Sequence, residues 1–415
     1  MLSPKAILVV LDGIGDRPIP QFNNRTPLQA AETPILDKLA RDGCCGIMDV
    51  ISPGYPVGSD VAHLTMLGYD FENDYPGRGP LEALGVGMDI GENDIALRGN
   101  LAHVDHSLVI VDRRAGRQIP EAEEFVGAVD GLVLENKPGI VFHAKHSTEQ
   151  RVACVIRGKG LSMAFSSTNP NRNYTPIEKS VPLDDSVEAK NTASIINDIT
   201  FQIYVKLKES PLNEKRKEKG LPLVNTILFH GAGKLKKVKG FQEKYNLKAG
   251  CVTGNGLIRG VCKYVGIDIL PCKGATGTLE TDLDEKINVL LSNMDNHDFL
   301  LLHIKATDST GHDKKPEKKK QFIEKVDKAL ARLISNMDYD STYIFITGDH
   351  TTPCEVGDHS GDPVPVLIAG PTVIKDDVEK FDETSCAAGY LSRIRGKDFF
   401  NLVLNKLGKL EKFGA

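Results

Sequence analysis

The chain has no tryptophan, and only 6% of its 415 residues are aromatic. It has no apolar run near the roughly 20 residues that a membrane-spanning helix needs, which argues against an integral membrane protein. The apolar segment at 6–13 is short and no cleavage-site pattern follows it, so we expect no secretory signal peptide. The formal net charge of −5 at pH 7 lacks the basic excess typical of nucleic-acid-binding proteins. We therefore expect a soluble protein whose partners are neither membranes nor nucleic acids.

Cysteine pairs of the C-x-x-C type are also absent, and the spacing of the cysteines fits no zinc ribbon. Scattered cysteines of this kind are typical of buried, reduced thiols, so we expect a cytoplasmic location. The eight residues are Cys44, Cys45, Cys154, Cys251, Cys262, Cys272, Cys354 and Cys386.

Two glycine-rich segments resemble nucleotide-binding loops but are incomplete. GNGLIRG at 254–260 is one residue too long for the dinucleotide fingerprint, and GAGK at 231–234 lacks the rest of a P-loop. The lysine-rich run at 314–321 is typical of a solvated helix start. We therefore expect no nucleotide cofactor.

Short apolar runs alternate with amphipathic stretches over much of the chain. Continuous apolar runs are typical of strands buried on both faces, and their alternation with helices predicts an α/β fold with a mostly parallel sheet covered on both sides. The expected strands are AILVVLDG (6–13), 225–233, 298–308, 341–350 and 363–371; the expected helices are 26–43, 255–266, 319–337 and 397–408.

The middle of the chain has shorter strands and more turns, and 415 residues exceed one ordinary core. We expect a smaller inserted α+β domain at 79–183. The turn-rich segment 166–186 is the expected return linker. The main domain would then be discontinuous, comprising 1–78 and 184–415.

Three of the expected strands end at an acidic residue: Asp12, Asp308 and Asp349. Ligands of open parallel sheets bind outside the carboxyl ends of the strands, so three such acids should converge on one edge. A single acid at such a place often only caps the next helix, whereas three together favour a functional site.

Histidines accompany these acids. His312 follows Asp308 by four residues, His350 follows Asp349 directly, and His359 comes nine residues later. Carboxylate and imidazole ligands together favour zinc, manganese or iron-type divalent ions over calcium. Six ligands are too many for one four-coordinate ion and suit two ions.

Ser59 begins the helical pattern SDVAHLTML after a Pro- and Gly-rich turn. A serine at this position is commonly just a helix N-cap. However, a helix N-terminus also favours a phosphate, and a serine oxygen next to a divalent ion loses its proton more easily. Ser59 is therefore our candidate nucleophile.

Longer motifs show a family resemblance over nearly the whole chain. The motifs are LDGIGDRP, TPLQAAETPILDKLARDG, PVGSDVAHLTMLGYD, GRGPLEALGVGM, DRRAGR, GATGTLETDLDEK, HIKATDSTGHD and GDHTTPCEVGDHSGDPVP. With these motifs in this order, the sequence resembles the archaeal-type, cofactor-independent phosphoglycerate mutases, members of the alkaline-phosphatase-like metalloenzyme superfamily.

The resemblance implies a reaction and a ligand assignment. It implies interconversion of 3-phosphoglycerate and 2-phosphoglycerate, in glycolysis and gluconeogenesis, through a phosphoserine at Ser59 and without bisphosphoglycerate. Two divalent ions, with manganese favoured and zinc, cobalt or magnesium as alternatives, would be bound by Asp12, Ser59, Asp349 and His350 and by Asp308, His312 and His359, respectively.

The resemblance also implies that the inserted domain closes over the substrate. Arginine pairs well with carboxylate and phosphate groups. The expected substrate-binding residues are Lys305, which lies inside the HIKATD motif, and Asp112, Arg113, Arg114, Arg117, Arg151 and Arg259.

The chain departs from the family pattern at three places. His230 stands where we expect an arginine, Gly99 where we expect a cysteine, and Lys314, Lys315 and Pro316 where glycine and an acid usually follow. These departures affect none of the seven expected metal-site positions. They bear instead on the expected contacts to the substrate.

Two alternative functions remain open from the sequence. A phosphatase or another phosphomutase of the same superfamily would use the same site on a different small phosphate ester. A non-catalytic homologue would keep the fold as a binding protein, although the complete ligand set argues against that. The sequence also leaves open whether the chain forms a homo-oligomer.

Overall fold

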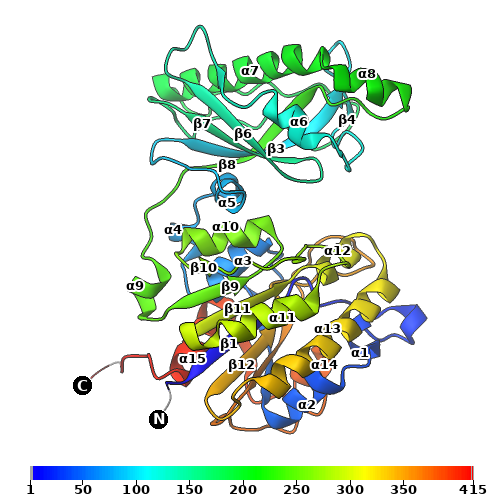
Figure 1. The fold of residues 1–415 in the computed structure, drawn as a ribbon, viewed down its shortest axis with the longest axis vertical. Helices are drawn as coiled ribbons and strands as arrows, with labels where there is room; N and C mark the ends of the chain where they lie inside the picture. Colours follow the sequence, from blue (N-terminus) through cyan, green and yellow to red (C-terminus); the bar gives the residue numbers. More distant parts are fainter. Residues whose placement is uncertain (1–2, 413, 415) are drawn as a thin grey trace. The chain divides into compact units, whose positions relative to one another are not determined.

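The computed structural model describes residues 3–412 and 414 (Figure 1). The chain divides into two compact units, one formed by Met1–Tyr75 with Val238–Ala415 and the other by Pro76–Lys237. The second unit is thus inserted into the first, as the sequence predicts. The inserted unit is longer than the expected 79–183: it ends at Lys237 instead of at position 183.

The first unit contains an eight-stranded sheet with the order β10-β9-β11-β1-β12-β13-β2-β14. Neighbouring strands run parallel, except that β13 runs antiparallel to both β12 and β2. This confirms the mostly parallel sheet. The strands are β1 Lys5–Leu11, β2 Cys44–Asp49, β9 Ala249–Val252, β10 Asp268–Ile269, β11 Phe299–Ile304, β12 Thr342–Thr347, β13 Val364–Ala369 and β14 Ser392–Arg395.

Helices cover both faces of this sheet. Alternate residues of the central strands, such as Ile7 and Ile344, pack with α2, α11 and α13 into one core. The opposite face carries Phe299 and Phe345, which contact Phe400 and Phe399 of α15. A strand covered on both sides has no polar face, which is why these strands read as continuous apolar runs.

The helices of the first unit follow the predicted positions with local breaks. The predicted helix 26–43 is two helices, α1 and α2, separated at Pro34; Asp327 of α13 accepts hydrogen bonds from the Ile35 and Leu36 amides at the start of α2. The bounds are η1 Pro20–Phe22, α1 Pro27–Ala30, α2 Pro34–Asp42, α3 Ser59–Met66, α4 Phe71–Asp74, α9 Phe241–Tyr245, α10 Gly256–Tyr264, α11 Leu283–Ser292, η2 Met294–Asn296, α12 Ala306–His312, α13 Pro316–Asn336, α14 Glu383–Cys386 and α15 Gly396–Lys406.

The second unit is built on an antiparallel sheet with the order β4-β3-β7-β6-β5, and β8 pairs with β3. Its core includes Phe142, Phe229 and the buried face of α7. The elements are β3 Ile95–Val104, β4 Ile110–Asp112, β5 Leu132–Val133, β6 Val141–Thr148, β7 Arg151–Arg157, β8 Thr226–Gly233, α5 Arg78–Gly85, α6 Ala122–Gly127, α7 Val187–Lys208 and α8 Pro211–Glu218.

The strand at 225–233 corrects the predicted boundary. We expected it in the parallel sheet, but β8 pairs antiparallel with β3, and both α5 and α7 contact it. A strand of an antiparallel sheet that is covered on both faces gives the same apolar run as a strand of a parallel sheet, so the pattern could not separate the two.

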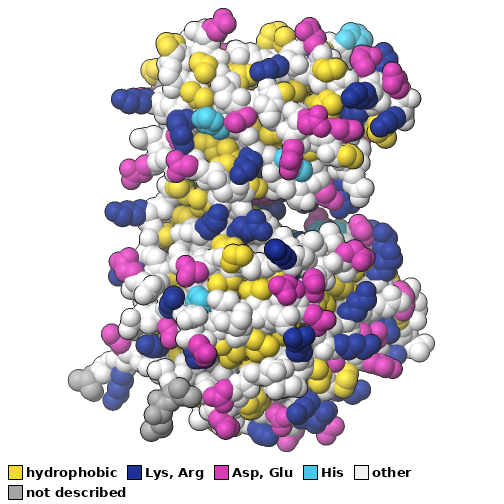
Figure 2. Space-filling model, in the orientation of Figure 1, with side chains coloured by type: hydrophobic (Ala, Val, Ile, Leu, Met, Phe, Trp, Pro, Cys, Tyr) yellow, Lys and Arg dark blue, Asp and Glu magenta, His cyan; other side chains and the backbone are white. Residues whose placement is uncertain are grey.

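No helix among residues 3–412 is long and apolar enough to cross a membrane. Figure 2 shows acidic and basic side chains interspersed over the visible face of the protein. This distribution agrees with the near-balanced composition of 51 Lys and Arg against 56 Asp and Glu.

Candidate metal centre

The three predicted acids come from three adjacent strands in the middle of the first unit's sheet. Asp12 follows β1 directly, Asp349 lies two residues beyond β12, and Asp308 lies in α12, shortly after β11. The order β11-β1-β12 makes these strands neighbours, so their carboxyl ends lie side by side. All three residues are buried, at 0% to 1% exposure. Buried carboxylates at one sheet edge require compensating positive charge.

Asp12 is surrounded by nitrogen atoms. Its Oδ2 accepts a 2.9 Å hydrogen bond from His303 Nε2, its Oδ1 accepts a 3.1 Å hydrogen bond from Lys305 Nζ, and His350 Nε2 lies 3.4 Å from Oδ1. Burial raises the pKa of the Asp12 carboxyl, but Lys305 and the histidines outweigh it and hold that pKa well below its ordinary value. Asp12 is therefore a carboxylate at neutral pH.

Asp308 has a similar environment. Its Oδ2 is 2.7 Å from Lys305 Nζ, and its Oδ1 is 3.3 Å from His312 Nε2 and 3.4 Å from His359 Nε2. The hydroxyl of Thr352 donates a 2.8 Å hydrogen bond to the same Oδ1. Burial raises the Asp308 pKa, but Lys305, His359 and His350 together outweigh it and hold that pKa below its ordinary value, so Asp308 is also ionised.

The outer histidines have one nitrogen anchored and the other directed at a carboxylate. His312 Nδ1 donates to the Gly357 carbonyl at 3.0 Å, and His359 Nδ1 donates to the Val57 carbonyl at 2.7 Å. A carbonyl only accepts, so in both rings the proton is on Nδ1, and in the neutral ring Nε2 carries a lone pair. Metal-binding histidines usually have this arrangement, with one nitrogen on the ion and the other donating to a fixed acceptor.

Asp349 and Ser59 complete the inner part of the site. Asp349 Oδ1 accepts a 3.0 Å hydrogen bond from the Gly13 amide, whereas its buried Oδ2 accepts none from the described residues. Ser59 Oγ, at the first position of α3, lies 3.1 Å from His350 Nε2. A buried carboxylate oxygen without a donor fits a bound cation, which would supply the missing partner.

Glycine is needed at position 13 because Thr352 and Asp308 pack closely against it. Gly13 has φ +63°, and a Cβ there would lie 2.5 Å from Thr352 Oγ1 and 2.7 Å from Asp308 Cβ. A larger residue would therefore strain the backbone and push these two side chains away.

Among the described residues, two groups of ligand atoms lie close enough to bind a metal ion. One is Asp308, His312 and His359, and the other is Asp12, Asp308 and His350; within each group the atoms lie within 4.8 Å of one another. The first group has the composition expected from the family resemblance. The second differs from the expected set, because Asp308 belongs to both groups while Asp349 and Ser59 border the second.

Comparison with known proteins identifies the family. A family model described as the metalloenzyme superfamily matches residues 4–406. The 2,3-bisphosphoglycerate-independent phosphoglycerate mutase 1 of Methanocaldococcus jannaschii is 44% identical, and the corresponding mutase of Ignicoccus hospitalis is 46% identical, with all of each chain covered. The chain belongs to the 2,3-bisphosphoglycerate-independent phosphoglycerate mutases. This confirms the family resemblance, and with it the divalent-metal-binding character of the site.

Two solved structures support the fold. A Pyrococcus horikoshii protein is 36% identical and superposes with a TM-score of 0.86 over the whole of both chains. The cofactor-independent phosphoglycerate mutase from Thermoplasma acidophilum is also 36% identical, with a TM-score of 0.71 over 98% of this chain and 100% of its own. The α/β fold with an inserted second domain is thus shared with close relatives.

Two buried histidines of this mutase-family chain were missed by sequence reasoning. His303, on β11, holds Asp12 and is itself 3.2 Å from Thr253 Oγ1. His63, on α3, donates from Nδ1 to the Ser59 carbonyl and lies 3.6 Å from Asp349 Oδ2. Burial lowers the His63 pKa to about 4. Two signals in the sequence could have found them: His303 stands inside an apolar strand, and His63 follows Ser59 by four residues on the expected helix.

The predicted substrate-binding residues fall in both units. Lys305 and Arg259 belong to the first unit, whereas the DRRAGR residues and Arg151 belong to the second. In the second unit Glu149 contacts both Arg117, at 2.9 Å, and Arg151, at 3.6 Å. The structure therefore brings these two arginines together at one carboxylate.

The other DRRAGR side chains have separate partners. Both Asp112 oxygens accept backbone hydrogen bonds, from the Arg114 and Gly116 amides at 2.8 Å, so Asp112 stabilises its own turn. Arg113 contacts Asn171. Partial desolvation of the Arg114 guanidinium, and then the charges of Arg113 and Arg117, lower the pKa of Arg114.

The departures from the family pattern also have local explanations. His230 lies on β8 near Arg98, and burial followed by the Arg98 charge lowers its pKa to about 4. A Cβ on Gly99 would lie 2.5 Å from Ile227 Cγ2, so the present packing of β3 against β8 favours glycine there. Lys314 donates to the Glu355 carbonyl and Pro316 begins α13, so these residues form the turn after α12.

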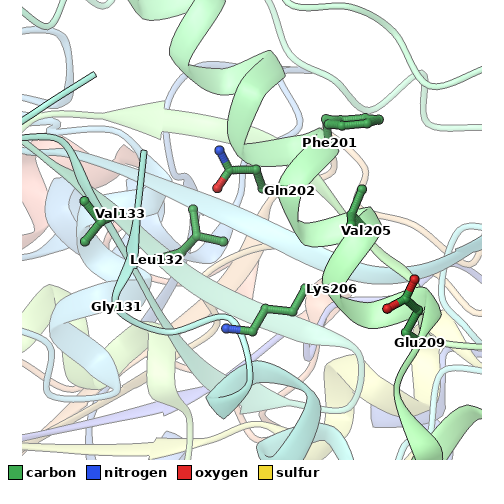
Figure 3. A pocket seen from close by; sticks show the side chains of 8 residues that line it. All are labelled: Gly131, Leu132, Val133, Phe201, Gln202, Val205, Lys206 and Glu209. Atoms are coloured by element: carbon green, nitrogen blue, oxygen red, sulfur yellow. The ribbon is translucent and has the colours of Figure 1, made fainter. Parts of the chain in front are cut away.

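The second unit has a surface groove of about 690 Å³ between β5 and α7 (Figure 3). Its lining mixes apolar side chains, of which Val133 and Phe201 are exposed, with the polar Gln202, Lys206 and Glu209. It contains neither of the ligand groups described above. The candidate site therefore remains the metal centre of the first unit.

Proposed function

We propose that this chain interconverts 3-phosphoglycerate and 2-phosphoglycerate at the metal centre, through a phosphoserine formed on Ser59. The observation that carries the proposal is the position of Ser59 Oγ, at the start of α3 and 3.1 Å from His350 Nε2. Family membership supports the reaction. The reaction belongs to glycolysis and gluconeogenesis, which favours a cytoplasmic location.

Two divalent ions would be held by the clustered carboxylates and histidines. We assign Asp12, Ser59, Asp349 and His350 to one ion and Asp308, His312 and His359 to the other, and we favour manganese because the ligands mix carboxylate with imidazole. Bound there, the ions would supply positive charge to phosphate oxygens and favour the ionised form of the serine. Asp308, which we assign to the second ion, also lies with Asp12 and His350 in the other ligand group.

The protein's own residues then carry out two phosphoryl transfers. In the first, a bond forms between Ser59 Oγ and phosphorus, the ester P–O bond of 3-phosphoglycerate breaks, and the proton lost by Ser59 is balanced by the one gained on the glycerate oxygen. The glycerate reorients, and its other hydroxyl takes the phosphoryl group back from Ser59, which regains a proton. The start of α3 favours the phosphoserine, because helix N-termini stabilise anions.

Basic residues would hold and neutralise the substrate. Lys305 is the best placed, because its ammonium group already contacts Asp12 and Asp308 at the site. We propose that the arginines bind the carboxylate or phosphate of the substrate. These arginines are Arg113, Arg114, Arg117, Arg151 and Arg259. Asp112 would bind the hydroxyl groups of the substrate.

A coupled assay tests this function. Metal-stripped protein is given 3-phosphoglycerate without bisphosphoglycerate, and 2-phosphoglycerate and free phosphate are measured with and without added Mn²⁺. Metal-dependent isomerisation supports the mutase. Release of free phosphate alone would instead identify a phosphatase that uses the same site, and the absence of both products would favour another phosphate ester or a non-catalytic role.

A further inference from the structure

Thr352 lies between the two groups of candidate ligands. Its hydroxyl donates to Asp308 Oδ1 at 2.8 Å and lies 3.0 Å from His350 Nδ1. Asp308 belongs with His312 and His359, whereas His350 belongs with Asp12. A single hydroxyl thus contacts both groups.

The direction of these hydrogen bonds follows from the number of protons. A threonine hydroxyl has one proton to donate, and the ionised Asp308 accepts it. The contact with His350 then requires the imidazole to donate, so the His350 proton is on Nδ1. In the neutral ring the lone pair of Nε2 therefore points towards Ser59 Oγ, Asp12 and Asp349, at 3.1 to 3.4 Å.

His350 differs in this respect from the two outer histidines. His312 and His359 are anchored by backbone carbonyls, which do not depend on any side chain. The anchor of His350 is a side-chain hydroxyl, and its orientation depends on Asp308. Any loss of this hydroxyl would therefore affect a ligand in each group.

The surrounding backbone holds Thr352 in place independently of its hydroxyl. Its amide donates to the Gly15 carbonyl at 3.1 Å, and its carbonyl accepts from the buried Lys319 ammonium at 3.0 Å. Glycines at 13 and 311 leave room for it, because a Cβ at either position would lie within 2.5 Å of a Thr352 atom. Replacing the hydroxyl should therefore leave the loop in position.

We propose that Thr352 is a positioning residue that couples the two ion sites, by donating to Asp308 and accepting from His350. The proposal rests on the two-ion function proposed above. In this arrangement the hydroxyl keeps His350 Nε2 available to one ion and orients the carboxylate that serves the other. Side chains that orient metal ligands in this way typically change metal affinity by about 10–100-fold when removed.

The experiment is a titration of metal-stripped protein with Mn²⁺ alone, which measures the number of ions bound and both dissociation constants. In Thr352→Val, which replaces the hydroxyl by a methyl group of similar size, we expect both dissociation constants to rise by about tenfold or more. Thr352→Ser keeps the hydroxyl and should restore most of the affinity. Thr351→Val is the matched control, since Thr351 is also buried but its hydroxyl donates to the Pro363 carbonyl and not to either ligand group.

The outcomes separate the inference from the proposed function. The coupling would be overturned if Thr352→Val left both Mn²⁺ affinities unchanged. It would also be overturned if the variant weakened the binding of one ion only. Wild-type protein that binds no Mn²⁺ would instead overturn the two-ion function itself. The melting temperature of each metal-free variant checks the fold, and Thr352→Ala provides a second hydroxyl-free variant if the valine does not pack.

Discussion

Lys305 Nζ lies 2.7 Å from Asp308 Oδ2, inside the cluster of carboxylates at the metal centre. The same ammonium group is 3.1 Å from Asp12 Oδ1. Burial lowers the Lys305 pKa, but these carboxylates outweigh it and raise that pKa above its ordinary value. In the absence of an ion, Lys305 is therefore the main charge that keeps the acids together.

Lys305→Met should destabilise the metal-free protein by about 3 kcal/mol, because it leaves two buried carboxylates without their cation. Mn²⁺ should reduce this loss of unfolding free energy, since it supplies the missing positive charge. Urea unfolding with and without Mn²⁺ measures both effects. Lys315→Met is the control: its ion pair with Asp313 is largely exposed and should contribute less than about 1 kcal/mol. An equal loss with and without Mn²⁺ would argue against this role.

Gly13→Ala should disrupt the metal centre. The new Cβ would press on Thr352 and Asp308 at a position with φ +63°, so we expect weaker Mn²⁺ binding and a loss of about 2 kcal/mol or more in stability. Gly54→Ala is a matched control, because Gly54 has φ +76° but open space around it. Similar effects of the two substitutions would mean that backbone strain, rather than contact with the ligands, explains the result.

Ser59→Ala should abolish the phosphoenzyme and lower the isomerisation rate by about 10³-fold or more, because no other oxygen would accept the phosphoryl group. Intact-protein mass spectrometry after acid quench detects the added phosphate. Ser360→Ala is a suitable comparison, since this serine is in the same region but hydrogen-bonds to Asp362. Near-normal turnover by Ser59→Ala would exclude covalent catalysis through this residue.

His230 should make the stability of the protein pH-dependent. Its pKa is lowered to about 4 in the folded state, against about 6.5 in an unfolded chain, so the unfolded state binds the proton more readily. The stabilisation is complete above about pH 6.5 and is lost as the pH falls towards 4, with about 2 kcal/mol gone at pH 5.

Urea unfolding at pH 7 and pH 5 checks this prediction. His230→Gln should reduce the difference in unfolding free energy between pH 7 and pH 5. His106→Gln, at an exposed position in the same unit, should leave that difference unchanged. A direct titration of His230 by NMR with a midpoint near 6.5 would contradict the prediction.

Sequence reasoning found the central strands and their acids because both leave local signals. The runs at 6–13, 298–308 and 341–350 are apolar throughout because β1, β11 and β12 are covered on both faces. The acids follow these runs directly, and the rule for parallel sheets predicts that such ends meet.

It missed residues whose role depends on packing between distant segments. His303 reads as one polar residue in an apolar strand, and Thr352 as an ordinary loop residue. Each becomes part of the site only through a contact with another segment, His303 with Asp12 and Thr352 with Asp308. The return of the inserted unit at Lys237 was missed for a related reason, since strand partners are not encoded in the apolar pattern of one strand.

The sequence by itself determined the α/β class, the family, and the kinds of side chain at the metal centre. These follow from local periodicity and from long motifs that any reader of the chain can find. Only the tertiary structure decided which atoms face one another: Asp308 shared by two ligand groups, Lys305 between two acids, and the Thr352 hydroxyl between Asp308 and His350. Such relations join residues up to hundreds of positions apart, and they are set by strand order and by hydrogen-bond partners that no local pattern records.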